Sequence, residues 1–181
     1  MATPARDPFP VAAPPPPDWT LRATGIALRP ASDADMPFLE RLYAASRADE
    51  LAHVPWTAAA KAAFVASQFA LQHRHYTAGG STTDFWIVER HGHPAGRLYV
   101  DRAPAMWHLV DLLLASVARG RGIGSALLDW LQQSARASGA SGIDLHVLIP
   151  NMRAAALYAR HGFTRVPDHS QTHRRMIWRI S

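Results

Sequence analysis

Residues 119–131, RGRGIGSALLDWL, carry the residue types most suggestive of chemistry, since three glycines and two arginines lie among the first six positions. Apolar residues at helical spacing follow directly after these positions. Glycine, which weakens regular structure, therefore lies immediately before the predicted start of a helix. The first helical turn has four N–H groups without partners, and the helix dipole adds positive potential. Bare backbone flanked by two guanidinium groups therefore suits a large anion such as a pyrophosphate.

Named phosphate-binding motifs do not match this segment. The Walker pattern requires a lysine after its last glycine, and Lys61 is the only lysine of the chain. The dinucleotide fingerprint requires a third glycine where this chain has Ser125 or Leu127, depending on which glycine starts the count. An arginine-glycine segment for nucleic acid would be repetitive and disordered, not a single copy joined to an amphipathic helix. A plain flexible strand-to-helix turn is the remaining alternative.

A second candidate group lies in the predicted helix MRAAALYARH. Asn151 can cap this helix, and Tyr158 follows seven residues later, about two helical turns, so both lie on one face. The spacing alone also fits a packing role for Tyr158, with its hydroxyl at the surface.

The elements that must position these residues follow from hydrophobic periodicity and turn signals. They predict a mixed α/β domain of the α+β kind, with a mostly antiparallel central sheet flanked by about four helices. The expected order is strand, two helices, three strands, helix, strand, helix and two strands. The segments are a strand over 25–30, helices over 34–50 and after Thr57, a hairpin over 84–101, a strand over 106–115, a helix from Ile123 to a stop at Gly139, a strand over 142–149, a helix over 152–161, and strands over 163–166 and 173–180.

Composition places limits on the chain. Its 181 residues, 48% hydrophobic and 18% charged, suit one globular domain. Half of the 14 prolines fall in residues 1–23, which we expect to be a disordered or polyproline tail ahead of a domain over 24–181. No apolar run reaches the length of a membrane span and no signal peptide is recognisable, so a cytoplasmic protein without a membrane partner is expected.

Several chemistries are excluded or made improbable by the residue counts. The chain has no cysteine, which excludes disulfides, a thiolate zinc site and a cysteine nucleophile. Its formal charge of +5 fits nucleic acid, a phosphorylated ligand or simply biased composition. Two pairs of closely spaced histidines could bind a metal ion, but no acidic pair lies beside them, so no metal site is predicted. The pairs are His73 with His75 and His91 with His93.

The arginine-glycine loop resembles the pyrophosphate loop of the GNAT superfamily, the acyl-CoA-dependent N-acetyltransferases. That loop reads Arg or Gln, two residues, Gly, one residue, Gly or Ala, as residues 119–124 do here. The late helix of the family also has its counterpart, in the expected order and separated from the loop by a strand. Its matching residues are Asn151, Ala154, Leu157, Tyr158, Gly162 and Phe163. By element order the resemblance covers roughly 24–181, whereas motif-level evidence covers 106–163.

The resemblance implies a cofactor site. Backbone amides of the loop would hold the pyrophosphate of coenzyme A, and two splayed central strands, 107–115 and 142–149, would hold the pantetheine arm between them. Backbone groups of the first strand would pair with the arm like an added strand. The residues implied to bind acetyl-CoA are Leu112, Leu114, Arg119, Gly120, Arg121, Gly122, Ile123, Gly124, Ser125 and Asn151.

The resemblance also implies catalytic roles. Tyr158 would protonate the departing CoA thiolate, since a phenol is protonated at neutral pH. Relatives often carry a base about eleven residues before the loop, which is His108 here. Asp111 is the reserve candidate, with opposite strand parity to His108, and a water molecule is a third. Without a cysteine, direct attack of the amine in a ternary complex is the simpler mechanism.

The expected activity is transfer of an acetyl group from acetyl-CoA to the primary amine of a small molecule or amino acid. Acetylation of a protein or peptide amine, and noncatalytic sensing of acyl-CoA, are the alternatives. The expected partners are acetyl-CoA and a small amine, without nucleic acid, and the assembly could be a homodimer. The resemblance assigns the acceptor pocket to the two early helices and the last strand pair.

Overall fold

The computed structural model describes residues 8–10, 15–78 and 82–180, and within them the chain forms seven strands and five helices. The strands are β1 Ile26–Pro30, β2 Thr83–Arg90, β3 His93–Asp101, β4 Met106–Leu114, β5 Gly142–Leu148, β6 Thr164–Arg165 and β7 His173–Arg179. The helices are α1 Trp19–Arg22, α2 Met36–Ala52, α3 Ala58–Thr77, α4 Ile123–Ala137 and α5 Met152–Arg160, with short 3-10 turns at Asp33–Asp35 and Ser116–Ala118. None of these helices is both long and apolar enough to cross a membrane.

The strands form one sheet in the order β1-β2-β3-β4-β5-β7-β6. Only β4 and β5 run parallel, because the chain passes through α4 between them, and every other neighbouring pair is antiparallel. The predicted mixed α/β fold with a mostly antiparallel sheet is therefore confirmed. Apart from α1, the elements also follow the predicted order.

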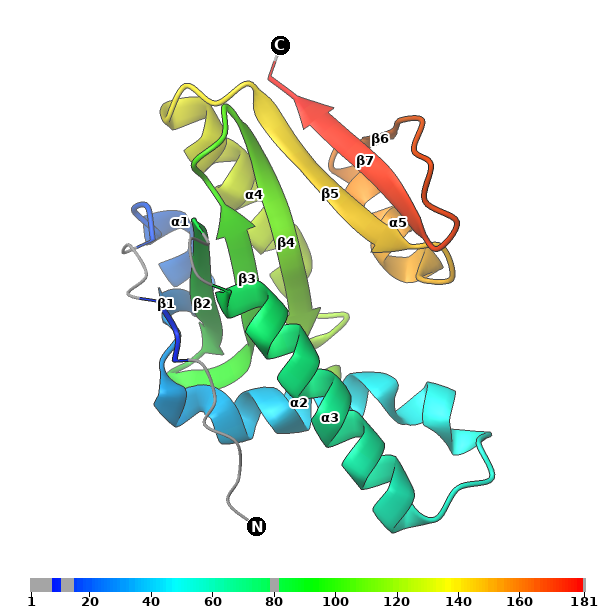
Figure 1. The fold of residues 1–181 in the computed structure, drawn as a ribbon. Coiled ribbons are helices and arrows are strands. Elements are labelled where there is room, and N and C mark those ends of the chain that lie inside the picture. Colours follow the sequence, from blue (N-terminus) through cyan, green and yellow to red (C-terminus); the bar gives the residue numbers. More distant parts are fainter. Residues whose placement is uncertain (1–7, 11–14, 79–81, 181) are drawn as a thin grey trace.

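The parallel pair comes apart along its length. β4 and β5 pair only from Met106 opposite Gly142 to Leu109 opposite Leu145. Beyond this point the two strands diverge toward their C-terminal ends, as Figure 1 shows. β4 remains paired with β3, and β5 with β7, so each diverging strand keeps one hydrogen-bonded neighbour. The expected splay of the central strands is thus present.

A β-bulge coincides with the point of divergence. Tyr99 of β3 lies opposite Asp111, whereas the next residue, Val100, lies opposite Leu109. Val110 is therefore an extra residue in β4. A bulge of this kind bends its strand and increases the local twist. We infer that the bend at Val110 turns the second half of β4 away from β5.

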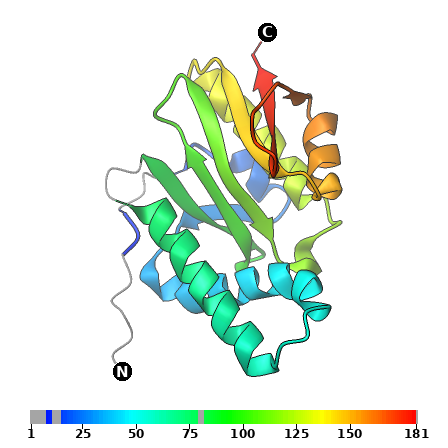
Figure 2. The same ribbon diagram turned by 45° about the vertical axis from the view of Figure 1, so that its right-hand side comes forward.

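Two hydrophobic cores cover the two faces of the sheet. On one face α1, α4 and α5 pack over a core that includes Trp86, Leu98, Leu131 and Ile143. On the other face α2 and α3 pack over a second core that includes Leu39, Phe69, Phe85, Ile87 and Tyr99. Figures 1 and 2 show α2 along the lower end of the sheet and α3 crossing it diagonally in front, with α4 behind the sheet. β4 contributes side chains to both cores, and its position is thereby fixed from both sides.

The start of the chain corrects one expectation. Residues 15–22 are not a disordered tail, because Leu21 of α1 is 1% exposed and belongs to the first core. The indole N–H of Trp130 in α4 also donates to the carbonyl oxygen of Pro17, 3.1 Å away. Four residues in a proline-rich segment carry too little periodicity to reveal such a helix. The domain therefore begins before residue 24. The same expectation for residues 1–7 and 11–14 lies outside the described residues.

We predict that Leu21→Ala lowers the free energy of unfolding by about 2 to 5 kcal/mol, because it leaves a cavity in the first core. Chemical denaturation followed by tryptophan fluorescence measures this value. Leu71→Ala is the control, since Leu71 is 50% exposed on α3 and its truncation should change stability by about 0.5 kcal/mol or less. Equal, small effects of both changes would contradict a structural role for α1.

Candidate active site

The arginine-glycine loop joins the diverging end of β4 to α4. Gly120 and Gly122 have φ angles of 73° and 77°, in the left-handed region that favours glycine, and Gly122 is the N-cap residue of α4. A Cβ atom on Gly122 would meet nothing within 4 Å, and one on Gly120 would meet only the guanidinium of Arg153, at 3.7 Å. The backbone here is therefore open to a large ligand. This open surface fits the expected pyrophosphate cradle, with the first amides of α4 as donors.

The third glycine of the loop has a different physical reason. A Cβ atom on Gly124 would lie 3.0 Å from Cδ2 of Leu157, a side chain of α5. Gly124 therefore permits close packing of α4 against α5. The helices that flank the divergence of β4 and β5 are held together at this point.

The two loop arginines are held by main-chain oxygens. Nε of Arg119 donates to the carbonyl of Leu114 at 2.9 Å, and Nε of Arg121 donates to the carbonyl of Val117 at 2.8 Å. Each guanidinium is thus kept beside the loop through one nitrogen. Together with the open glycines, these two cations give the loop a positive surface suited to phosphate.

Asn151 acts as the N-cap of α5, as its position in the sequence predicted. Its side-chain oxygen accepts a hydrogen bond from the N–H of Ala154 at 3.1 Å. Since this bond already occupies the amide oxygen, capping accounts for an asparagine here without a ligand. Its contact with the cofactor stays a prediction.

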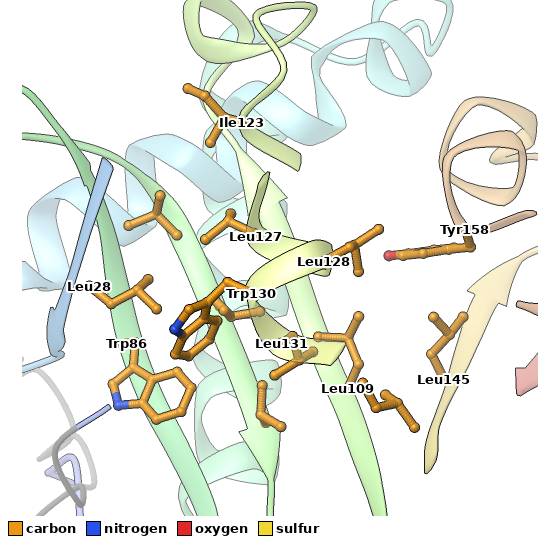
Figure 3. Packing of buried hydrophobic residues seen from close by; sticks show 14 of the residues in the cluster. Leu28, Trp86, Leu109, Ile123, Leu127, Leu128, Trp130, Leu131, Leu145 and Tyr158 are labelled. Carbon is orange, nitrogen blue, oxygen red and sulfur yellow. The ribbon is translucent and has the colours of Figure 1, made fainter. Parts of the chain in front are cut away.

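Tyr158 of α5 is buried beside the divergence of the strands. It is 8% exposed, and Figure 3 shows its side chain reaching from α5 toward Leu128 of α4. The ring of Tyr158 therefore packs in the core of α4 and α5. Burial, reinforced by the negative charge of Asp111, raises the pKa of the Tyr158 phenol above its ordinary value. The phenol therefore keeps its proton at neutral pH.

The bulge in β4 changes which side chains share a face. Regular alternation predicted opposite faces for His108 and Asp111, and this expectation is wrong. Val110, the extra residue, packs in the core of α2 and α3, and Asp111 reaches Arg97 on the same side of the sheet. His108 alternates with Trp107 and Leu109, which pack in the opposite core, so it also faces α2 and α3. Both candidate bases consequently lie on one face.

His108 makes a specific contact with the neighbouring strand. Its Nδ1 lies 2.7 Å from Oδ1 of Asp144 in β5. Arg175 of β7 donates to the other oxygen of Asp144 from Nε at 3.0 Å and from Nη2 at 2.7 Å. Burial opposes ionisation of Asp144, but the hydrogen bonds from His108 and Arg175 outweigh it and hold the pKa of that carboxyl below its ordinary value. The side chain of His108 is 35% exposed, so its ring is accessible from solvent.

Asp111 is engaged in a different way. Its carboxylate forms an ion pair of 2.5 Å with Arg97, whose side chain is only 3% exposed, and Arg97 also donates to Gln72 of α3. The carboxylate of Asp111 is thus already engaged by a buried guanidinium, whereas the ring of His108 is accessible from solvent. This arrangement favours His108 over Asp111 as the base.

Sequence reasoning missed Arg97, Asp144 and Arg175. Asp144 had a usable signal, since it is the one carboxylate of the apolar strand over 142–149, and such groups are paired in folded proteins. Its partners come from other strands, and no spacing in the sequence relates them. In the part of the chain that the structure describes, no group of three His, Cys, Asp or Glu side chains could hold a metal ion.

Leu112 and Leu114 lie in the second half of β4, beyond the bulge. Their side chains pack against the core of α4 and α5, and they lie opposite Leu98 and Gly96 of β3. The other edge of β4 has lost β5 by this point, and it has no strand partner among the described residues. Main-chain groups of this edge are therefore suited to pair with an extended ligand.

Comparison with known proteins agrees with this geometry. A model of the acetyltransferase (GNAT) family matches residues 40–163, well over half of the chain. A segment of 54 residues, 30% of this chain, is 46% identical to mycothiol acetyltransferase of Beutenbergia cavernae, and spans 18% of that protein. The match thus covers less than a fifth of this relative's length.

Solved structures share the fold over most of the chain. PaiA N-acetyltransferase of Thermoplasma acidophilum, solved in complex with coenzyme A, superposes with a TM-score of 0.66 at 16% identity, covering 86% of this chain and 99% of that one. Spermidine N-acetyltransferase of Vibrio cholerae, solved with CoA and spermine, has a TM-score of 0.57 at 17% identity, covering 86% and 95%.

The family match spans both the diverging strand pair and the two motifs that flank it, and the solved structures have the same fold. The chain belongs to the GNAT family of acyl-CoA-dependent N-acetyltransferases.

Proposed function

We propose that this protein transfers an acetyl group from acetyl-CoA to the primary amine of a small molecule or amino acid, by direct attack within a ternary complex. One observation carries the proposal. The divergence of β4 and β5 opens beside a loop of unobstructed left-handed glycines, and a buried tyrosine lies next to the same opening. The three features together suit a thioester attached to a long phosphorylated arm.

The cofactor would bind along β4. Its pyrophosphate would accept hydrogen bonds from the amides of residues 121–125, with Arg119 and Arg121 supplying charge. Its pantetheine arm would pair with the free edge of β4 at Leu112 and Leu114, which carries its amides toward the divergence. The thioester would then lie near the bulge, between Tyr158 and the face that carries His108.

The chemistry requires three proton transfers, two from the amine nitrogen and one to the leaving sulfur. An ordinary primary amine arrives as ammonium, and its deprotonation at pH 7 costs about 4 to 5 kcal/mol, which a base offsets. His108 would accept this proton, directly or through water, and the amine nitrogen would attack the thioester carbonyl carbon. The C–S bond would then break as Tyr158 gives its proton to the departing thiolate. The acetylated nitrogen would lose its second proton to water, and the tyrosinate would regain a proton from solvent.

The class of acceptor is supported by similarity alone. A structural neighbour was solved with the polyamine spermine, and the relative with the matching segment is named for acetylation of mycothiol, a small molecule. These two names suit a small amine, whereas another neighbour of the same fold, RimL, is a ribosomal L7/L12 alpha-N-protein acetyltransferase.

The proposed function is tested first by calorimetric titration of the protein with acetyl-CoA, with free CoA and a short oligonucleotide as controls. We expect one-to-one binding of acetyl-CoA in the micromolar range, after which amines are screened by release of CoA. Absence of binding of both CoA species at millimolar concentration would overturn the proposal. Binding without release of CoA for any amine would favour a sensor.

Gly122→Ala should weaken acetyl-CoA binding by about tenfold, because the new methyl group faces the open cradle and alanine strains the left-handed backbone. Gly139→Ala is the matched control, since Gly139 ends the same helix with a φ of 75° and equally open space. Both variants should lose similar stability in thermal unfolding, whereas calorimetry should detect weaker binding only for Gly122→Ala. Equal affinities of the two variants would rule out the loop as the cradle.

Tyr158→Phe should reduce kcat by about 100-fold or more, because the thiolate then leaves without a proton donor, while the Kd for acetyl-CoA stays unchanged. Steady-state kinetics and calorimetry measure the two quantities. Tyr43→Phe is the control, since Tyr43 is an equally buried tyrosine in the opposite core. A Tyr158→Phe enzyme with the wild-type kcat would refute the role of the phenol.

A further inference from the structure

A chain of hydrogen bonds joins three strands on the face of the sheet toward α2 and α3. It runs from His108 of β4 through Asp144 of β5 to Arg175 of β7. We propose that Asp144, held by Arg175, is a positioning residue that fixes the tautomer and the direction of His108, so that Nε2 is the nitrogen that accepts the proton. This inference rests on the proposed role of His108 as the base.

The chemistry of the three groups dictates the tautomer. An ionised carboxylate only accepts hydrogen bonds, and a guanidinium only donates them. Arg175 occupies one oxygen of Asp144 with two donors, and the other oxygen lies 2.7 Å from Nδ1 of His108. Nδ1 must therefore carry the proton in the neutral ring. Its lone pair is then on Nε2, on the opposite side of the ring from Asp144.

The strands also fix the direction of the ring. His108 lies directly opposite Asp144 in the parallel ladder, within the four residue pairs that precede the divergence. Asp144 lies opposite Ile177, and Arg175 is two residues away on the same face of β7. All three side chains therefore project from paired backbone, just before the strands separate. A base anchored there is held at the edge of the opening that would receive the thioester.

Other charged groups near His108 have their own partners or are farther along the face. The ring of His146 in β5 lies 5.6 Å from that of His108, and its Nε2 is 3.5 Å from Asp168. Asp101 of β3 lies opposite His108 in the ladder and accepts hydrogen bonds from Thr82 and the main chain. Asp111, on the same face of β4, is paired with Arg97. Asp144 is the carboxylate that contacts the ring.

Asp144→Asn provides a specific test, because Arg175 constrains how the new amide lies. The guanidinium can bond only the amide oxygen, so the amide NH₂ turns toward Nδ1 of His108. Nδ1 must then accept, and the ring proton moves to Nε2, the wrong tautomer for a base that accepts there. Asp168→Asn is the matched control, since it changes the same residue type beside His146 and leaves Asp144 intact.

The tautomer is read from the ¹⁵N shifts of the imidazole nitrogens in the full-length protein, at a pH where the ring is neutral. The His108 signals are assigned by their loss in His108→Gln. We expect the Nδ1–H form in the wild type and in Asp168→Asn, and the Nε2–H form in Asp144→Asn. An Nε2–H ring in the wild type would overturn the proposal, even if Asp144→Asn failed to fold. This readout does not depend on turnover, so a failure of the proposed function is distinguished from a failure of this inference.

Kinetics supply a second readout that a merely structural role would not move. Asp144→Asn should lower kcat by about 100-fold or more with little change in the KM for acetyl-CoA. Asp144→Ala should lose less, because the ring is then free to adopt either tautomer. A larger loss in Asp144→Ala than in Asp144→Asn would contradict tautomer control.

Discussion

Two parallel strands that stop pairing after four residues are the constraint on which the rest of this structure depends. Main-chain N–H and C=O groups are costly to leave without partners away from water, so a sheet can open only where something else satisfies them. β3 and β7 supply one neighbour to each diverging strand. The inner edges are left to water or to a ligand that offers main-chain-like groups. A pantetheine arm, with its two amides, is such a ligand.

Particular residues explain how each element around the divergence of β4 and β5 is positioned. The left-handed Gly122 caps the start of α4 at the end of the loop that follows β4, and Gly124 lets that helix approach Leu157 of α5. This approach holds α5 beside the opening, with Tyr158 turned inward. On the opposite face, His108 is presented by the last paired residues of β4. The proposed donor and the proposed acceptor of protons thus come from different layers, on opposite faces of the sheet.

Much of the fold and of the candidate site could be predicted from the sequence. Hydrophobic periodicity indicates the helices and strands, and capping residues and glycines indicate where they begin and end. Long periodic segments such as α4, the cap at Asn151 and the glycine-rich segment before α4 are local features of the sequence. The short helix at Leu21 has no such period, and its place depends on Trp130, more than a hundred residues later. The pairing of His108 with Asp144 is a property of the ladder between two strands. The bulge at Val110 lies in the run LVDLLL, which is almost entirely apolar. A shift in the alternation of side chains between the two faces of the strand therefore leaves no sign in the order of apolar and polar residues.

The bulge at Val110 bends β4 without changing which of the other side chains pack in each core. The core under α4 and α5 takes Leu109 before the bulge and Leu112 after it, while Val110 and Asp111 both face the other way. If Val110 were absent, ordinary alternation would send every remaining side chain to the face it already occupies. The inferred result is a regular strand without the bend that turns its second half away from β5. A single residue inserted in frame separates the two forms of this strand, so a bend of this kind can be gained or lost by insertion or deletion without any change in the chemistry of its neighbours.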